Sequence, residues 1–127
     1  MTKEDKELLM RDLCARLSYS VQCCAKNNHK ISGSLVGIIG ENVHVFSSGH
    51  GVFSINVIKP YLLPLSSMTE EEKEEYCQLQ QRVIYNGKGV VNEDIAKYIN
   101  WCYKKHLDIN NLIPMELAID ATGLNIY

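Results

Sequence analysis

The spacing of apolar residues changes twice along this chain, and that change limits the fold more than any other feature. Near both ends, from Leu9 to Leu17 and from Ile95 to Cys102, apolar side chains recur at the three- to four-residue spacing of amphipathic helices. Between these regions, short apolar runs are separated by polar turns, which is typical of strands. The order of helix, strands and helices predicts an α+β fold with a small antiparallel sheet.

The chain of 127 residues is long enough for a single domain with three parts. A β meander of four strands joined by short turns is predicted, and it forms either an SH3-like barrel or an open curved sheet. The N-terminal helix and the C-terminal helices flank this meander. The three parts are a helix over 1–18, the meander with a proline-rich connector over 19–64, and a helical part over 65–127. The strands are expected at 20–25, 31–39, 42–47 and about 53–57.

Local signals refine the ends of these elements. Thr2 with Asp5, and Thr69 with Glu72, have the spacing of capping boxes and predict two helix N-termini. The segment 59–64 contains two prolines and is predicted to be a rigid connector rather than a ladder strand, because each proline lacks an N–H donor. A last short helix is expected near 110–118, with Pro114 in its first turn.

The charge and the cysteine content of the chain limit its expected partners and its expected cellular location. Thirteen basic and fifteen acidic side chains give a net charge of -2, which argues against binding nucleic acid mainly through a basic surface. No apolar run reaches the length of a membrane span, and the acidic start of the chain does not resemble a signal peptide. Five cysteines without a disulfide-like spacing are expected to be free thiols. We therefore expect a cytoplasmic protein that does not contact membranes.

Two residues have a spacing that metal sites use. Cys102 and His106 are four residues apart in a predicted helix, and Cys23, Cys24 and His29 are the candidates for further ligands. A place in the apolar core explains Cys102 and His106 better, because no CxxC, HxxxH or neighbouring carboxylate accompanies them. No metal and no cofactor is therefore predicted. A cysteine nucleophile would need a nearby histidine and an orienting partner, and the sequence shows no such set. The sequence therefore predicts a protein that is not an enzyme.

The polar turns of the meander are the predicted contact surface, because they are free of core residues and rich in glycine and asparagine. The predicted binding residues are Lys26, His29, Lys30, His50 and Tyr61. An alternative function is nucleic-acid binding, with aromatic rings stacking on bases and lysines forming a modest basic edge. The aromatic residues in that alternative are Tyr19, Phe53 and Tyr61, and the lysines are Lys26, Lys30 and Lys59.

Three stretches together resemble a known group of proteins: 11–17 (RDLCARL), 59–72 (KPYLLPLSSMTEEE), and the looser set Trp101, His106, Asp108, 112–113 and 117–118. The chain is similar to small uncharacterised proteins of phages, prophages and mobile elements of gut Bacteroidales. It departs from them at Ser18, where a proline is usual, and at Leu63, where an arginine is usual.

The resemblance implies an accessory protein that acts by binding, for example in counter-defence. Such a protein would block a host factor or sequester a nucleotide signal. The expected partner is a host or phage protein or a small nucleotide, and nucleic acid is the alternative.

Overall fold

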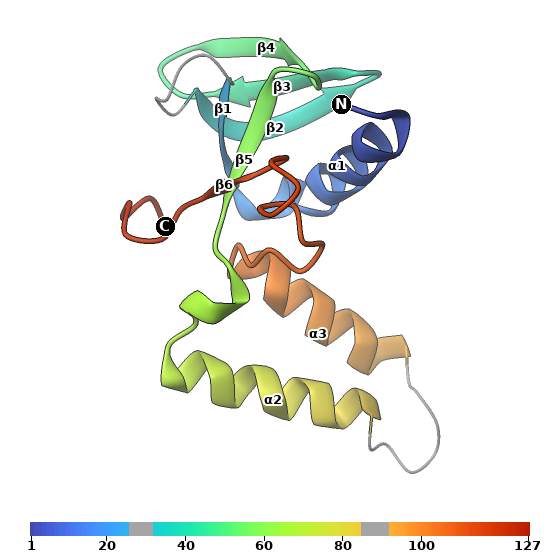
Figure 1. The fold of residues 1–127 in the computed structure, drawn as a ribbon, viewed down its shortest axis with the longest axis vertical. Helices are drawn as coiled ribbons and strands as arrows, with labels where there is room; N and C mark the ends of the chain where they lie inside the picture. Colours follow the sequence, from blue (N-terminus) through green and yellow to red (C-terminus); the bar gives the residue numbers. More distant parts are fainter. Residues whose placement is uncertain (26–31, 85–91) are drawn as a thin grey trace.

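Six strands form one open mixed sheet in the order β4-β3-β2-β1-β5-β6 (Figure 1). The computed structural model describes residues 1–25, 32–84 and 92–127. The first four strands are antiparallel neighbours, β5 returns antiparallel to β1, and β6 is parallel to β5. The strands are β1 (Gln22–Ala25), β2 (Gly33–Ile39), β3 (Asn42–Phe46), β4 (His50–Ser54), β5 (Ile58–Leu62) and β6 (Ile119–Asp120).

Helices flank the sheet at both ends of the chain, which confirms the predicted α+β architecture. In Figure 1, α1 lies beside the sheet, whereas α2 and α3 lie side by side at the opposite end of the molecule. β4 and β6 are the two edges of the sheet, so the open sheet is formed rather than the SH3-like barrel. None of the helices in the described segments has the length and apolar character needed to cross a membrane. The helices are α1 (Lys3–Ala15), α2 (Glu70–Ile84) and α3 (Asn92–Lys104), with short 3-10 turns η1 (Leu17–Tyr19) and η2 (Leu65–Ser67).

Both predicted capping boxes are confirmed. The Thr2 hydroxyl accepts a hydrogen bond from the Asp5 N–H at 3.1 Å, and the Asp5 carboxylate accepts from the Thr2 N–H at 3.3 Å. At α2, the Thr69 hydroxyl accepts from the Glu72 N–H at 3.1 Å, and Glu72 accepts from the Thr69 N–H at 3.0 Å. These bonds satisfy N–H groups that have no partner within the helix. The first helix is shorter than predicted, because it ends at Ala15 and continues as η1.

The prediction that the proline-rich connector is not a ladder strand is wrong, because β5 contains Pro60 and pairs with β1. The Cys23 carbonyl accepts from the Ser32 N–H at 2.8 Å, so the backbone polar groups of Cys23 face β2. Cys23 and Pro60 are therefore opposite each other without exchanging hydrogen bonds. On the other side of β5, the pairing with β6 begins at Tyr61, so no ladder bond requires the N–H that Pro60 lacks.

The fourth strand ends earlier than predicted. The alternation of Phe53, Ile55 and Val57 predicted one strand, but β4 ends at Ser54 and a turn follows. The Val57 N–H donates to the Ser54 carbonyl at 3.0 Å, which closes this turn. Ile55 is still buried in the core, so its apolar character reflects packing in a turn rather than strand periodicity.

The predicted short helix near 110–118 is absent, and turns held by a carboxylate take its place. Asp108 accepts from the N–H groups of Leu112 at 2.8 Å and Ile113 at 2.9 Å. Asn111 and Glu116 have φ values of 59° and 61°, in the left-handed region that interrupts a right-handed helix. The chain then enters β6, which the sequence did not predict.

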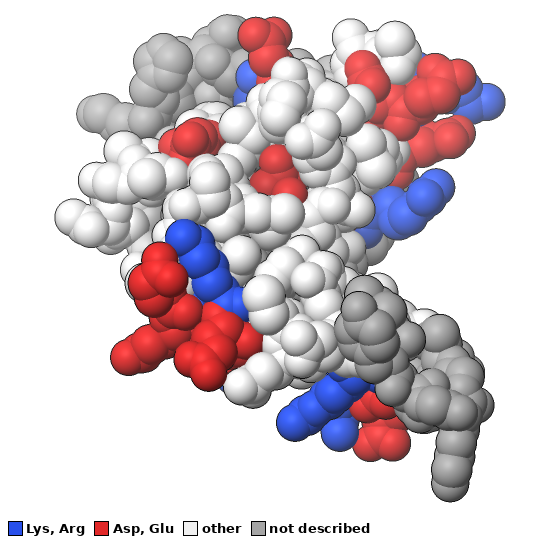
Figure 2. All heavy atoms as spheres, turned by 60° about the horizontal axis from the view of Figure 1, so that its bottom comes forward, with Lys and Arg blue, Asp and Glu red and all other residues white. Residues whose placement is uncertain are grey.

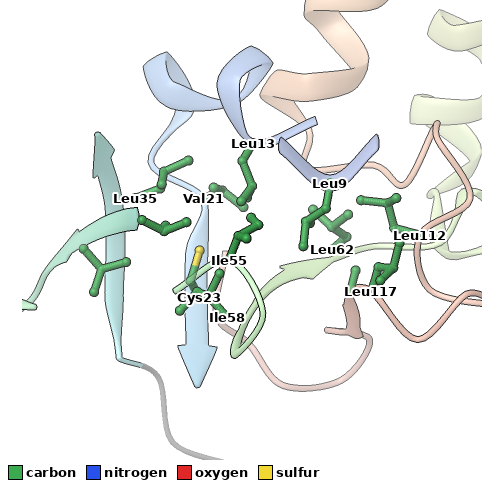
Figure 3. Close-up of a cluster of buried hydrophobic side chains, with 13 residues drawn as sticks. Leu9, Leu13, Val21, Cys23, Leu35, Ile55, Ile58, Leu62, Leu112 and Leu117 are labelled. Carbon is green, nitrogen blue, oxygen red and sulfur yellow. The ribbon is translucent and has the colours of Figure 1, made fainter. Parts of the chain in front are cut away.

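The core lies between the sheet and α1, as Figure 3 shows. Leu13 of α1 points toward Val21, which directly precedes β1, and Leu9 points toward Leu62 of β5. The segment after α3 closes one side of this cluster. Its fully or nearly buried members are Leu9, Leu13, Val21, Cys23, Leu35, Val43, Val45, Ile55, Ile58, Leu62, Leu112, Leu117 and Ala118.

A buried ion pair joins α1 to the segment after α3. Asp12 of α1 is only 1% exposed, and Arg16 is fully buried. The Arg16 Nε–H donates to Asp12 at 2.5 Å, and its Nη2 donates to the Leu107 carbonyl at 2.7 Å. The Asn110 amide donates to the other Asp12 oxygen at 2.8 Å, and the Tyr103 ring lies under the guanidinium, 4.7 Å from it. These contacts satisfy the Asp12 carboxylate and the Nε and Nη2 of Arg16, whereas Arg16 Nη1 has no hydrogen-bond partner among the described residues. The direct pairing of the two charges offsets part of the cost of burying them.

Candidate functional site

The outer face of β3 and β4 carries aromatic and apolar side chains. Val43 and Val45 of β3 are buried in the core, so the alternate residues His44 and Phe46 point outward. The register with β4 places Val52 opposite His44 and His50 opposite Phe46. The two imidazoles lie diagonally across the strands, and His44 Nδ1 is 2.7 Å from His50 Nε2.

A β-bulge in β2 places a glycine beside these side chains. The register shifts between Leu35 and Gly37, so that Gly37 rather than Val36 is the partner of His44. A Cβ atom at Gly37 would meet nothing within 4 Å. The surface next to the His44 imidazole is therefore open, and a side chain can be added at Gly37 without a clash.

The same three strands expose large apolar side chains and carry no charge. Val36, Ile39, Phe46 and Val52 are 55%, 70%, 54% and 53% exposed. No Lys, Arg, Asp or Glu occurs in β2, β3 or β4. A contiguous apolar area on a monomer is typical of an interaction surface. We call this surface the open face, and its residues are Ser34, Val36, Gly37, Ile39, Asn42, His44, Phe46, His50, Val52 and Ser54.

Over β1 and β5, by contrast, the outer side of the sheet is covered. Cys24 and Tyr61 form a second buried cluster with Ala121, and Ile126 of the C-terminal tail packs against it. The Tyr127 hydroxyl accepts from the Gln22 N–H at 2.8 Å and donates to the Tyr61 carbonyl at 2.8 Å. The tail therefore bridges β1 and β5, and we call this region the closed face.

Cys102 and His106 do not share a helix face. α3 ends at Lys104, and His106 has a φ of 60° beyond that end, while Cys102 is fully buried within the helix. The His106 ring stacks on Tyr127, with 3.6 Å between ring centroids. Burial and the nearby Arg16 charge lower the pKa of His106 to about 4. In the part of the chain that the structure describes, no three His, Cys, Asp or Glu residues are placed to hold a metal.

The buried cysteines are poor nucleophiles. Burial raises the pKa of Cys102 to about 11 and, with the adjacent Cys24, raises the pKa of Cys23 to about 12. Both side chains are therefore thiols at neutral pH, whereas the reactive species is the thiolate. All five cysteines are free, and Cys14 and Cys77 are the exposed ones.

The predicted binding residues separate into three groups. Lys26, His29 and Lys30 lie outside the described residues. His50 lies on the open face, at the start of β4. Tyr61 is 4% exposed in the cluster of the closed face.

The aromatic platform of the nucleic-acid alternative is not assembled. Phe53 packs against the main core, whereas Tyr61 belongs to the separate cluster of the closed face. Tyr19 lies in η1. Of the three lysines in the proposed basic edge, Lys59 alone is described, and it lies in β5.

A groove of about 510 Å³ lies between α1 and the turn from β2 to β3. Met10 and Ile55 contribute apolar lining, and Lys6 forms a 4.0 Å ion pair with Glu41. Arg11 and Glu7 also line it, so its two cations are matched by two acids. This balance gives the groove no net attraction for a charged ligand.

Charged side chains are concentrated on the helices. Figure 2, which brings the α2–α3 end forward, shows acidic groups beside a few basic ones with uncharged surface between them. Near the start of α2, Lys73 pairs with Glu70 at 3.3 Å and Lys105 pairs with Glu72 at 4.0 Å. The first turn of α2 is acidic, as the dipole of a helix favours, so this acidic run has a structural explanation.

Of the residues on the open face, the sequence predicted only His50 as a binding residue, and the residues that it missed include His44, Phe46 and Val52. A signal for His44 and Phe46 was present, because Val43 and Val45 are two residues apart in the predicted strand 42–47 and therefore share one of its faces. The intervening His44 and the following Phe46 then had to occupy the other face. Val52 required the register between β3 and β4, which the sequence does not contain.

Comparison with family models, with curated proteins and with solved structures finds no match to this chain.

Proposed function

We propose that this protein is a non-catalytic binding module that holds a protein partner on its open face. The observation that carries the proposal is the uncharged surface of β2, β3 and β4, on which four large apolar side chains are more than half exposed. Burying that surface against a partner would remove apolar area from water, which is the main driving force of protein association.

The chemistry of the open face favours a protein over a nucleic acid. Nucleic-acid binding depends on Lys and Arg that contact phosphates, and the three strands contain neither. The centre of a protein interface is depleted of charge and enriched in aromatic residues, as Phe46 and its neighbours are here. The expected partner therefore presents an uncharged, apolar patch of its own.

The resemblance to proteins of phages and mobile elements indicates which kind of partner the open face would bind. A phage or mobile-element accessory protein in a bacterial cytoplasm would use this surface to block a host factor, as a counter-defence protein does.

The test is capture of partners from a Bacteroidales lysate by the immobilised protein, with quantitative mass spectrometry. Gly37→Lys adds a charge to the open face, at a position where an added Cβ atom would meet no other atom within 4 Å. Gln78→Lys adds the same charge to an exposed position on α2 and is the matched control. Both variants should keep the melting temperature of the wild type.

We expect Gly37→Lys to lose the captured protein and Gln78→Lys to retain it. Desolvating an unpaired charge in an interface costs several kcal/mol, which corresponds to more than about 100-fold in affinity. Retention by Gly37→Lys together with loss by Gln78→Lys would instead place the binding surface on the helices.

A further inference from the structure

His44 and His50 bring two ring nitrogens to one point on the protein surface. His44 Nδ1 and His50 Nε2 are 2.7 Å apart, and the two ring planes meet at 64° with centroids 4.9 Å apart. The rings are therefore not stacked but converge through their nitrogen atoms. At least one of those two nitrogens must carry a proton for this contact to be a hydrogen bond.

We propose that His44 and His50 form a two-histidine clamp for a divalent transition metal such as Ni²⁺, Cu²⁺ or Zn²⁺. Neutral imidazole nitrogen is a preferred ligand of these ions. Two nitrogens bound to one ion at about 2.05 Å, with a bond angle of roughly 90–110°, lie about 2.9–3.4 Å apart. The clamp reaches that spacing when the rings separate by a few tenths of an ångström.

The backbone fixes the two ligands independently of their own contact. His44 is held outward because its neighbours Val43 and Val45 are buried. His50 is held by the β3–β4 register, in which Phe46 is its partner. Because both ligands stand on paired strands, little further ordering is needed when the ion binds.

The proton balance of metal binding is simple. In the neutral pair, one ring donates the proton that lies between the two nitrogens. When the ion binds, that ring changes its tautomer, and both rings then carry their N–H on the nitrogen that faces away from the ion. These nitrogens are His44 Nε2 and His50 Nδ1. The metal then takes one lone pair from His44 Nδ1 and one from His50 Nε2, and no net proton is released from the neutral pair.

The strands around the two histidines leave room for the ion and carry no positive charge that would repel it. Gly37, the strand partner of His44, has no side chain, and a Cβ atom added there would meet nothing within 4 Å. No lysine or arginine lies in β2, β3 or β4 to repel a cation. No third His, Cys, Asp or Glu joins the pair within 1–25, 32–84 and 92–127, so water would fill the remaining coordination positions.

The test is calorimetric titration with Ni²⁺, which favours imidazole over oxygen ligands. All proteins carry Cys14→Ser and Cys77→Ser, because these two thiols are exposed and would compete for metal. They also carry His29→Gln, which removes another histidine of the chain. Into this background we introduce His44→Ala, His50→Ala, or the control Asn42→Ala on the same outer side of β3.

We expect about one Ni²⁺ per chain, and at least a ~10-fold weaker affinity in each histidine variant, because a single imidazole loses the chelate advantage. Asn42→Ala should bind as the background protein does. Absence of saturable binding, or equal affinity in His44→Ala and the background protein, would overturn the clamp.

A second readout locates the ion. Ni²⁺ is paramagnetic in octahedral coordination, so amide resonances of β3 and β4 should broaden before those of α2 and α3. Broadening confined to the helices would also overturn the proposal. Both readouts use the isolated protein, so their outcome is independent of whether a partner is captured on the open face.

Discussion

The outer side of the sheet is closed over β1 and β5 and open over β2, β3 and β4. On the closed face, Tyr61 is buried with Cys24 and Ala121, and the Tyr127 hydroxyl bridges two strands. On the open face, Phe46 and Val52 remain more than half exposed. One continuous sheet therefore has an outer surface that is covered by its own C-terminal tail at one end and left uncovered at the other.

The difference separates residues that stabilise the fold from residues that are free to bind. The closed face depends on the segment after α3, which the buried Asp12–Arg16 pair connects to α1 through Leu107 and Asn110. No described part of the chain packs on the open face. Substitutions should therefore reduce stability in the first region and leave stability nearly unchanged in the second.

The largest expected effect is that of Asp12→Ala. This change leaves the Arg16 guanidinium fully buried without its carboxylate, so the free energy of unfolding should fall by about 3–5 kcal/mol. Urea denaturation followed by circular dichroism measures this change. A matched control is the double variant Asp12→Leu with Arg16→Met, which removes both charges and should recover much of the loss. A single variant as stable as the wild type would show that the pair does not anchor the C-terminal segment.

Two valines on neighbouring strands test the two sides of the sheet directly. Val45→Ala removes buried methyl groups from the core side of β3, and we expect a loss of about 2–3 kcal/mol. Val52→Ala makes the same chemical change on the open face, where the side chain is 53% exposed, and should cost less than ~0.5 kcal/mol. Thermal melting of both variants is the measurement. Equal losses would contradict the assignment of inner and outer sides.

The next effect is a loss of stability in mild acid. The pKa of His106 is lowered to about 4 in the folded protein, against an ordinary value of 6.5, because of burial and the Arg16 charge. The unfolded chain therefore binds a proton first as the pH falls. The contribution of the neutral ring is fully present above about pH 6.5 and decreases toward pH 4. The lowered pKa corresponds to roughly 3 kcal/mol, which solvent screening of the partly exposed ring reduces to roughly 2 kcal/mol.

His106→Asn is the control for this pH dependence, since asparagine tolerates the left-handed backbone at this position. The variant should lose the part of the pH slope that lies between pH 6.5 and pH 4, measured as unfolding free energy at several pH values. An unchanged slope in the variant would mean that another group titrates in this range.

Among the changes on the closed face and in the segment that covers it, the smallest expected effect is that of Tyr127→Phe. The change removes the hydroxyl that joins the Gln22 N–H to the Tyr61 carbonyl but keeps the ring that stacks on His106. We expect a loss of about 1 kcal/mol, because water can replace part of the hydrogen bonding. Hydrogen exchange should show faster exchange of the Gln22 amide in the variant than in the wild type. An unaltered exchange rate would show that the tail does not close this end of the sheet.

The sequence predicted the elements whose signals are local. The two capping boxes, the helical stripe of α1 and the meander of β1 to β4 all depend on residues close together in the chain. β5 was not predicted, because the effect of Pro60 depends on which strand pairs with it and in which register. The hydrogen bond from the Ser32 N–H to the Cys23 carbonyl shows why Pro60 is tolerated there. The turns at 110–118 were missed because the Asp108 carboxylate replaces the hydrogen bonds of the expected helix.

The candidate site was predictable only in part. His50 was identified from its place in a polar turn, and alternation in β3 was sufficient to find His44 and Phe46. The meeting of His44 with His50, and the empty space above Gly37, depend on the strand register and on one bulge. The covering of Tyr61 by the tail joins positions far apart in the sequence, so no periodicity could indicate it.

The most direct measurement is hydroxyl-radical footprinting of the protein alone and in complex with the partner captured from the lysate. If the open face is the contact surface, oxidation of Phe46 should decrease strongly in the complex. Oxidation of Trp101 in α3 and of the exposed Met115 should remain as in the free protein. An unchanged rate at Phe46, together with protection of Trp101, would contradict the account and assign binding to the α2–α3 end of the molecule.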